Sequence, residues 1–370
     1  MKVVIIGPYG REGSVKTITA KLAEHLSYNN RIYVITYSLN LPKFSLVNGV
    51  SIYNIYSKKI VNNPILINSL VNSIKTTINE IDPDIIHLSS TFAPYSIAVT
   101  NLSNRYPSLL TLFGLLSKVT KFRGLPRDFY GMMSLLGEKY TISKIQNIVV
   151  ESKYNMYVLR NFIRNDLNIF VIPSGVDFKE IKLLKNEIDK SLDENLDILY
   201  IGRLSKEKGV DVLIKSVKIA VKKKPDIRVV IAGKGPLKNE LIKITKKLDL
   251  NRNIKFVGYI SDLDKFRYYR LCKIVVVPSR WDFSPITIPE AMAFRKPVIA
   301  SNMTNSDLVI DGKTGYLFNS ENFYNLAEKI ILLLEDESKR VKLGERAYKL
   351  VKRFDWKSIA HEYLKVYKSI

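Results

Sequence analysis

The sequence predicts an α/β protein with two doubly wound domains. Short β-branched apolar runs alternate with longer amphipathic stretches along the whole chain. The runs are continuously apolar, which is typical of parallel strands buried on both faces. They form two series, separated by a charged stretch at 179–197 with little strand character, where we place a linker. The length of 370 residues suits two domains of ordinary size.

Each series contributes five expected strands, and helices are expected between them. One helix shows its period directly, because apolar residues at 210, 213, 214, 217 and 221 share one face. In such folds ligands bind at the carboxyl ends of the strands. The expected strands are 3–6, 32–35, 85–88, 148–150 and 169–172, then 198–201, 229–231, 254–257, 274–277 and 298–299.

The composition narrows the location and the chemistry. The single cysteine, Cys272, rules out a disulfide framework, so we expect a reducing, cytoplasmic compartment. No apolar run reaches the length of a membrane span, and the first one is too short for a signal peptide. With three histidines and one cysteine, a structural zinc site is not expected.

The formal net charge of +23 indicates an anionic partner or a lysine-rich compositional habit. Nucleic acid, an anionic membrane surface and anionic small molecules are the candidate partners. No nucleic-acid-binding module is recognisable, and the basic residues are not interleaved with stacking aromatics. We therefore expect no nucleic acid partner.

A glycine-rich loop follows the first expected strand, from Gly7 to Thr17. It differs from a phosphate-binding loop, because the β-branched Val15 occupies a position that needs glycine. We expect a turn before a helix that begins near Ser14. Its amides would bind an anion or a sugar hydroxyl, or the segment is an ordinary strand–helix turn.

Two cations follow the first strand of the second series. Arg203 and Lys208 precede a helix, and a diphosphate favours a guanidinium, an ammonium and a helix N-terminus together. The alternative is that both side chains are simply solvated.

Two acids, Asp282 and Glu290, flank a loop and a helix start eight positions apart. Because Pro289 precedes it, Glu290 should lie near the first turn of the helix. Its carboxylate would accept both hydroxyls of a vicinal diol such as ribose. Alternatively, Glu290 complements the helix dipole and Asp282 caps a turn.

These segments together resemble the GT-B retaining glycosyltransferases of family 4. The resemblance covers nearly the whole chain, and its blocks occur in the family's order. It implies two Rossmann-like domains facing across a cleft: 1–175 for the acceptor, 176–355 for the nucleotide sugar, and 356–370 returning to the first. The matching blocks are 173–177, 202–209, 231–237, 256–258, 278–292, 296–300, 312–317 and 354–356 with Tyr367.

The resemblance also implies roles for individual residues and an activity. The activity is transfer of a sugar from a UDP- or GDP-linked donor to an acceptor hydroxyl with retained anomeric configuration, without an essential metal or other cofactor. Asp282 would act on the transferred sugar. Arg203, Lys208 and Gly13 would hold the donor diphosphate and Glu290 its ribose. The sugar and phosphate loop would be Phe283, Ser284, Pro285, Ile286 and Thr287, and the base would meet Val257, Gly258, Tyr259, Ile260 and Gly233.

The chain departs from the family pattern at three places. The first acid is usually Glu, the loop after it usually carries glycines, and Phe113 stands where the family usually has a histidine. His87 matches another position that is common in the family. It would act either as a catalytic residue or as a hydrogen-bonded residue of the core. A non-catalytic relative is therefore an alternative. A GT-B epimerase or phosphorylase is a further alternative. An epimerase would need a different set of acids and a phosphorylase would need a lysine that binds pyridoxal phosphate, and neither feature is evident in the sequence.

The acceptor side is less defined. Lys118, Lys121, Arg123 and Arg127 alternate with apolar residues, and the apolar run 131–136 follows. This pattern is typical of a segment that rests on anionic lipid at the cytoplasmic membrane face. A glycan or a lipid-linked acceptor is the corresponding hypothesis, and a surface loop is the alternative.

Overall fold

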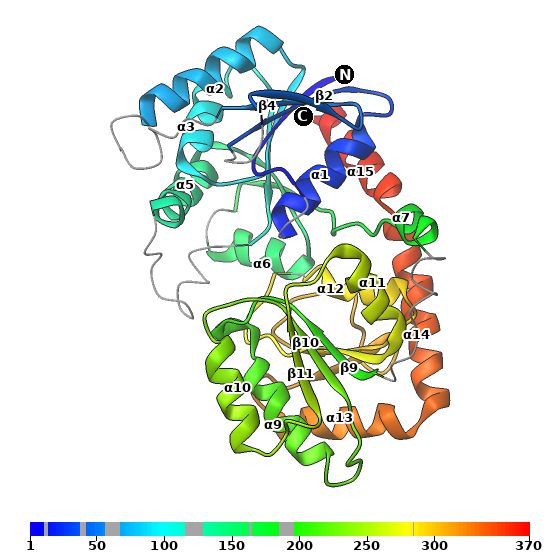
Figure 1. Ribbon diagram of the computed structural model, residues 1–370. Helices are drawn as coiled ribbons and strands as arrows, with labels where there is room; N and C mark the ends of the chain where they lie inside the picture. The colour runs from blue at the N-terminus through cyan, green and yellow to red at the C-terminus, as the bar shows by residue number, and fades with distance from the viewer. Residues whose placement is uncertain are drawn as a thin grey trace. The chain divides into compact units, whose positions relative to one another are not determined.

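The computed structural model describes residues 1–10, 14–37, 42–55, 67–114, 129–162, 165–184, 196–283 and 285–370. The chain divides into two compact units (Figure 1). Unit 1 consists of Met1–Ser174 and Trp356–Ile370, and unit 2 consists of Gly175–Asp355. Both are α/β units built on largely parallel sheets, which confirms the expected fold class.

Unit 1 contains an eight-stranded sheet in the order β3-β4-β2-β1-β5-β6-β7-β8. Among the strands in the described residues of this unit, only β3 runs antiparallel to its neighbour. The strands are β1 (Lys2–Ile6), β2 (Arg31–Thr36), β3 (Phe44–Val47), β4 (Val50–Asn54), β5 (Ile85–Leu88), β6 (Ser108–Leu112), β7 (Asn147–Val150) and β8 (Asn168–Val171). The helices are α1 (Ser14–Leu26), α2 (Ile67–Ile81), α3 (Ala93–Leu102), α5 (Phe129–Lys144), α6 (Lys153–Phe162) and α15 (Trp356–Ser369).

Unit 2 contains an all-parallel sheet in the order β11-β10-β9-β12-β13-β14. Its strands are β9 (Leu196–Ile201), β10 (Val229–Ala232), β11 (Ile254–Gly258), β12 (Cys272–Val277), β13 (Val298–Ser301) and β14 (Gly315–Phe318). Its helices are α7 (Phe178–Leu183), α9 (Val210–Ala220), α10 (Lys238–Lys247), α11 (Asp262–Leu271), α12 (Thr287–Ala293), α13 (Phe323–Glu335) and α14 (Glu337–Val351), with short 3₁₀ turns at Lys206–Lys208 and Lys352–Phe354.

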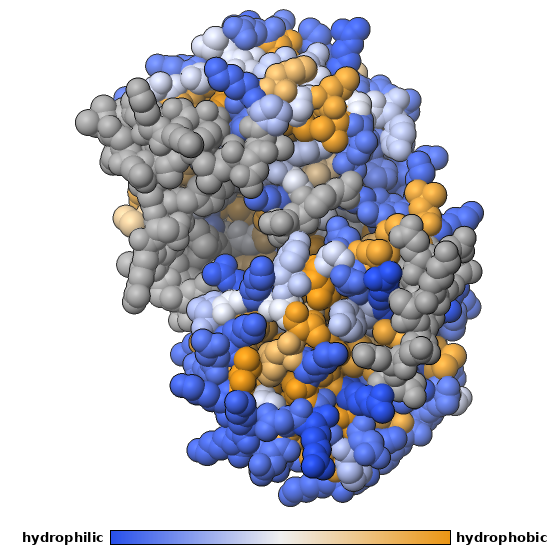
Figure 2. All heavy atoms as spheres, viewed as in Figure 1, coloured by the Kyte–Doolittle hydropathy of each residue, from blue (hydrophilic) through white to orange (hydrophobic). Residues whose placement is uncertain are grey.

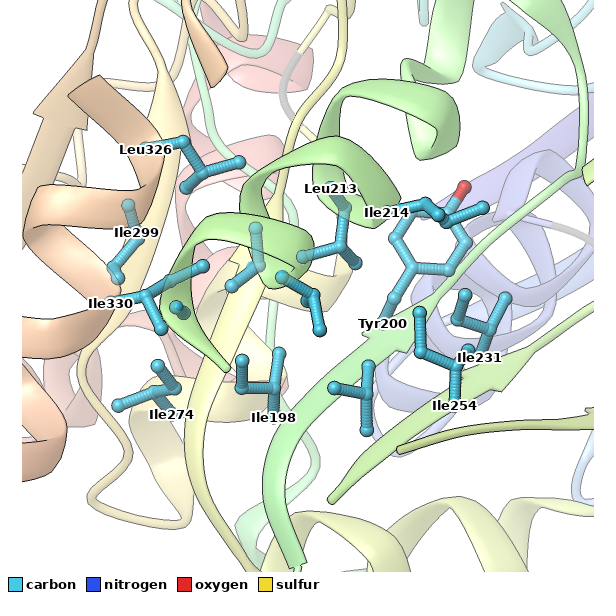
Figure 3. Packing of buried hydrophobic residues seen from close by; sticks show 14 of the residues in the cluster. Ile198, Tyr200, Leu213, Ile214, Ile231, Ile254, Ile274, Ile299, Leu326 and Ile330 are labelled. Atoms are coloured by element: carbon cyan, nitrogen blue, oxygen red, sulfur yellow. The ribbon is translucent and has the colours of Figure 1, made fainter. Parts of the chain in front are cut away.

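The core of unit 2 follows from the apolar periods of its sequence. Ile198, Ile231 and Ile274 project from neighbouring strands and pack with Leu213 and Ile214 of α9 (Figure 3). All five residues are 0% exposed. A continuous sheet buried in this way holds the loops at its carboxyl edge in fixed positions.

Two details differ from the sequence-based expectations. The edge strands β3 and β14 and the inner strands β4 and β6 are not among the expected strands, although each pairs with a neighbour. The linker predicted at 179–197 begins too early, because Phe178–Leu183 forms helix α7 within unit 2. The Asp177 carboxylate caps this helix by accepting from the Glu180 amide at 2.8 Å.

None of the helices in the described part of the chain is long and apolar enough to cross a bilayer.

Candidate functional site

The expected donor residues gather at the carboxyl edge of the unit 2 sheet. Arg203 and Lys208 follow β9, Gly233 follows β10, Gly258 ends β11, and Asp282 follows β12. After β9, the chain adds β10 and β11 on one side and then β12 on the other. The site therefore lies beside a topological switch point, where open α/β sheets bind their ligands.

Glycines allow the loops at this edge to approach closely. Gly209 has φ +63°, and a Cβ on it would lie 2.0 Å from the Pro278 carbonyl oxygen. Gly233 has φ +141°, and its Cβ would lie 1.8 Å from the Gly202 carbonyl oxygen. The backbone of the β9 loop therefore lies against both the β12 and the β10 loops, in conformations that side chains would prevent.

Lys208 and Asp282 form the central ion pair of the site. Lys208 Nζ lies 2.5 Å from Asp282 Oδ2, and both side chains are largely buried. The carboxylate also accepts from Ser279 Oγ at 3.1 Å and from the Phe283 amide at 3.0 Å. Burial, followed by the charge of Asp282, raises the pKa of the nearby Tyr200 phenol well above its usual value. The sequence predicted both charged residues, but not that they would pair.

Arg280 holds the two loops together. Its guanidinium forms a bidentate pair with Asp211 of α9, with both N–O distances 2.8 Å, and donates to the Lys206 carbonyl at 2.8 Å. Its backbone amide donates to the Glu207 carbonyl at 2.8 Å. Hydrogen bonding to Asp211 raises the pKa of Arg280. This clamp fixes the loop that carries Lys208 relative to the loop that carries Asp282.

Glu290 lies in α12 and is engaged by two residues of α11. Lys265 Nζ lies 2.7 Å from Glu290 Oε1, and Tyr269 Oη donates to Glu290 Oε2 at 2.9 Å. Lys265 also pairs with Asp262 Oδ1 at 3.0 Å. Glu290 thus does more than complement a helix dipole, because its carboxylate is bound on both oxygens.

The other residues expected to bind the donor differ in how exposed their side chains are. Arg203 is exposed, and no residue that the structure describes forms an ion pair with it. Tyr259 is 53% exposed, and Lys234 Nζ lies 5.2 Å from the centre of its ring. The Gly233 amide donates to the Gly258 carbonyl at 2.6 Å, so the two glycines expected near the base are adjacent.

The loop after Asp282 is only partly exposed. Phe283 is buried, with its ring edge-on to Trp281 at a centroid distance of 5.4 Å. Pro285, Ile286 and Thr287 are half-buried. Ser284 and Gly13, both expected at the donor, lie outside the described residues, as do Lys118, Lys121, Arg123 and Arg127.

Comparison with known proteins identifies the family. The profile described as glycosyl transferases group 1 matches residues 183–350, and that of glycosyltransferase family 4 matches residues 15–180. An uncharacterized glycosyltransferase of Methanocaldococcus jannaschii is 31% identical over 310 residues, which are 82% of this chain and 81% of that protein. The chain belongs to glycosyltransferase family 4.

Two solved structures share the fold of this glycosyltransferase. Sucrose-phosphate synthase from Thermosynechococcus elongatus matches with a TM-score of 0.81 and 20% identity, over 100% of this chain and 98% of that one. HepE from Anabaena, in complex with UDP and glucose, matches with a TM-score of 0.79 and 19% identity over 100% of both chains. The fold is thus that of the GT-B enzymes.

In unit 1 of the glycosyltransferase, the expected catalytic role of His87 is not supported. His87 is fully buried, with Nδ1 2.7 Å from Tyr367 Oη and Nε2 2.7 Å from Thr111 Oγ1. Both ring nitrogens are therefore occupied by protein partners, and burial lowers the pKa of His87 to about 3. The geometry matches the core alternative. Phe113, just after β6, is half-buried.

Sequence reasoning missed several residues of the glycosyltransferase's site. Lys265 and Tyr269 could have been found from their spacing of four, which places both on one face of a helix. Arg280 and Asp211 carry no such signal, because they pair across 69 positions. In the described part of the chain, no group of three or more His, Cys, Asp or Glu side chains could hold a metal ion.

Proposed function

We propose that this glycosyltransferase binds a nucleoside diphosphate sugar at the carboxyl edge of the unit 2 sheet and transfers the sugar to an acceptor hydroxyl with retention. The supporting observation is the set of charges beside the switch point between β9 and β12. Arg203 and Lys208 supply positive charge on one loop, and Asp282 and Glu290 supply acceptors after the other strand. A nucleotide sugar has the matching groups, an anionic diphosphate between two hydroxyl-bearing rings.

The proposed placement follows from these charges. The diphosphate would bind Lys208 and Arg203, near the start of α9, and the ribose would bind Glu290. The transferred sugar would donate its hydroxyls to Asp282, and the base would lie over Gly233, Gly258 and Tyr259. The complex of HepE with UDP and glucose supports the choice of ligand class for this fold.

The chemical step would rely mainly on electrostatic stabilisation. Negative charge develops on the diphosphate as the glycosidic bond breaks, and Lys208 and Arg203 would stabilise it. No side chain is assigned as a general base, and the departing phosphate itself would take the acceptor proton. Asp282 is shorter than Glu by one methylene, so the sugar would bind nearer the backbone of its loop.

For the acceptor we propose a glycan, carried on a lipid at an anionic membrane surface. Helix α5 exposes Met132, Leu136 and Tyr140, four residues apart along one face. Lys139 and Lys144 of the same helix are also exposed. An apolar stripe with flanking lysines suits an anionic bilayer interface. The basic residues from Lys118 to Arg127, outside the described part, would add to it.

A thermal-shift screen with UDP, GDP and their glucose and mannose conjugates tests the donor assignment. One base should raise the melting temperature of the wild type, because a ligand stabilises the state that binds it. Glu290→Ala should lose that response. The matched control Glu335→Ala, at the far end of α13, should keep it. A wild type that responds to none of these ligands would remove the donor assignment.

Retention is tested by the slow hydrolysis of the donor. If transfer retains configuration, an α-linked donor should first release the α-anomer of the sugar, read by proton NMR before mutarotation. Initial release of the β-anomer would contradict the proposed stereochemistry.

A further inference from the structure

Helix α11 presents two hydrogen-bond donors to one carboxylate. Lys265 and Tyr269 are four residues apart and therefore share a face of the helix. Lys265 Nζ binds Glu290 Oε1 at 2.7 Å, and Tyr269 Oη binds Glu290 Oε2 at 2.9 Å. One donor on each oxygen defines the plane of the carboxylate. Because each oxygen has a second lone pair, two acceptor positions remain for a ligand.

Both donors are themselves held in place. Tyr269 is 0% exposed, and its ring stacks on Phe294 with centroids 5.6 Å apart and planes at 24°. Lys265 is tied to Asp262 at 3.0 Å. The side chains of Lys265 and Glu290 are 14% and 15% exposed. Glu290 therefore has little freedom to choose another rotamer, which is the condition for a preorganised contact.

The charge of this cluster indicates what it would bind. One ammonium lies between two carboxylates, those of Asp262 and Glu290, which leaves an excess of one negative charge. Burial alone would lower the pKa of Lys265, but the two carboxylates raise it, so Lys265 stays charged. A phosphate would be repelled here, whereas a neutral pair of hydroxyls would add two donors without adding charge.

We propose that Lys265 and Tyr269 are positioning residues that orient Glu290 to accept both ribose hydroxyls and so fix the direction in which the nucleotide lies. This inference rests on the proposed donor site. The ribose lies at the acidic α11–α12 cluster, and the diphosphate lies toward Lys208. A purely structural tie between α11 and α12 would need the same ion pair, but it would not make nucleotide affinity depend on the ribose hydroxyls.

The test compares UDP and GDP with their 2′,3′-dideoxy analogues by isothermal titration. For the base that binds, the wild type should prefer the ribonucleotide by about tenfold or more, since hydrogen bonds to a charged acceptor are strong. In Lys265→Met this preference should fall to about twofold. Tyr269→Phe should reduce it to an intermediate value, and Lys265→Arg should restore part of it.

The control is Lys273→Met, which removes an equally close ion pair, to Asp197 at 2.8 Å, at the start of β12. It should keep the full preference. If Lys265→Met does not fold, Tyr269→Phe and Lys265→Arg decide the question. A full preference in folded Lys265 and Tyr269 variants overturns the positioning role alone. A wild type that binds neither UDP nor GDP overturns the donor site itself.

Discussion

The pairing of Lys208 with Asp282 has a consequence for ligand choice. The ammonium assigned to the diphosphate is already neutralised by a carboxylate 2.5 Å away. Asp282 is fixed by Ser279 Oγ and by the Phe283 amide, and Asn305 Nδ2 donates to its backbone carbonyl at 2.7 Å. A nucleoside diphosphate without a sugar must therefore bind against a fixed negative charge. A sugar attached to it would offset this repulsion by donating its hydroxyls to the same carboxylate.

We expect Asp282→Asn to bind the free nucleoside diphosphate about three- to tenfold more tightly, because the competing charge is gone. Sugar transfer should fall at the same time, because the acceptor for the sugar hydroxyls is weakened. Titration calorimetry with UDP and GDP measures the first effect. Asp226→Asn makes the same charge change on an exposed turn before β10 and should leave affinity unchanged. Weaker nucleotide binding by Asp282→Asn would contradict this competition.

Residue by residue, the sequence predicted which side chains carry the charges but not how they pair. Arg203, Lys208, Asp282 and Glu290 follow strand ends, and strand ends are visible as breaks in apolar runs. The partners of these residues depend on which helices pack side by side. Lys265 reaches Glu290 across 25 positions, and no local pattern encodes that distance.

At the scale of elements, the presence of an uninterrupted apolar run decided which strands could be predicted. The central strands β1, β9 and β12 each contain four consecutive apolar residues, so their runs stand out in the sequence. Strands β3 and β14 lie at sheet edges, and β3 is half exposed, with Phe44 54% and Leu46 68% exposed. Strand β3 is interrupted by Ser45 and strand β14 begins with Gly315, so neither stands out as a continuous apolar run.

Helix α15 is joined to the unit 1 sheet by a buried polar chain. His87 of β5 contacts Tyr367, and Thr111 of β6 lies 3.2 Å from Tyr363 Oη. His87 is neutral in the folded protein, because burial lowers its pKa from 6.5 to about 3. Below about pH 6.5 the unfolded chain takes up a proton that the folded chain does not. Stability is therefore lost as pH falls from 6.5 toward 3.

The expected loss from His87 is on the order of 3 kcal/mol between pH 7 and pH 4. The melting temperature of the wild type should accordingly fall more steeply over this range than that of His87→Gln. His361→Gln, at an exposed position on α15, should follow the wild-type slope. If the melting temperatures of the wild type and of His87→Gln fall equally steeply with pH, His87 is not held neutral by its burial.

At the scale of the whole molecule, the charge of +23 is the largest departure from an ordinary protein. On the face drawn in Figure 2, hydrophilic side chains cover most of unit 2, around a smaller number of apolar ones. The stripe of Met132, Leu136 and Tyr140 on α5 combines exposed apolar area with nearby lysines. These features underlie the proposal of an anionic membrane surface.

Co-sedimentation with vesicles tests that surface. The protein should bind phosphatidylglycerol vesicles more strongly than phosphatidylcholine vesicles, and added salt should weaken the binding. Met132→Ser with Leu136→Ser should reduce binding several-fold, because apolar insertion is lost. Replacing Leu183, which is 71% exposed on α7 of unit 2, by Ser is the control and should have no effect. Binding that is insensitive to both lipid charge and the α5 changes would remove the membrane proposal.

A crystal structure with the nucleoside diphosphate that gives the largest thermal shift tests the central claim most directly. The account predicts the diphosphate within hydrogen-bond distance of Lys208 Nζ and both ribose hydroxyls on the Glu290 carboxylate, at the carboxyl ends of β9 and β12. A nucleotide bound without contact to Lys208 or Glu290 would contradict it.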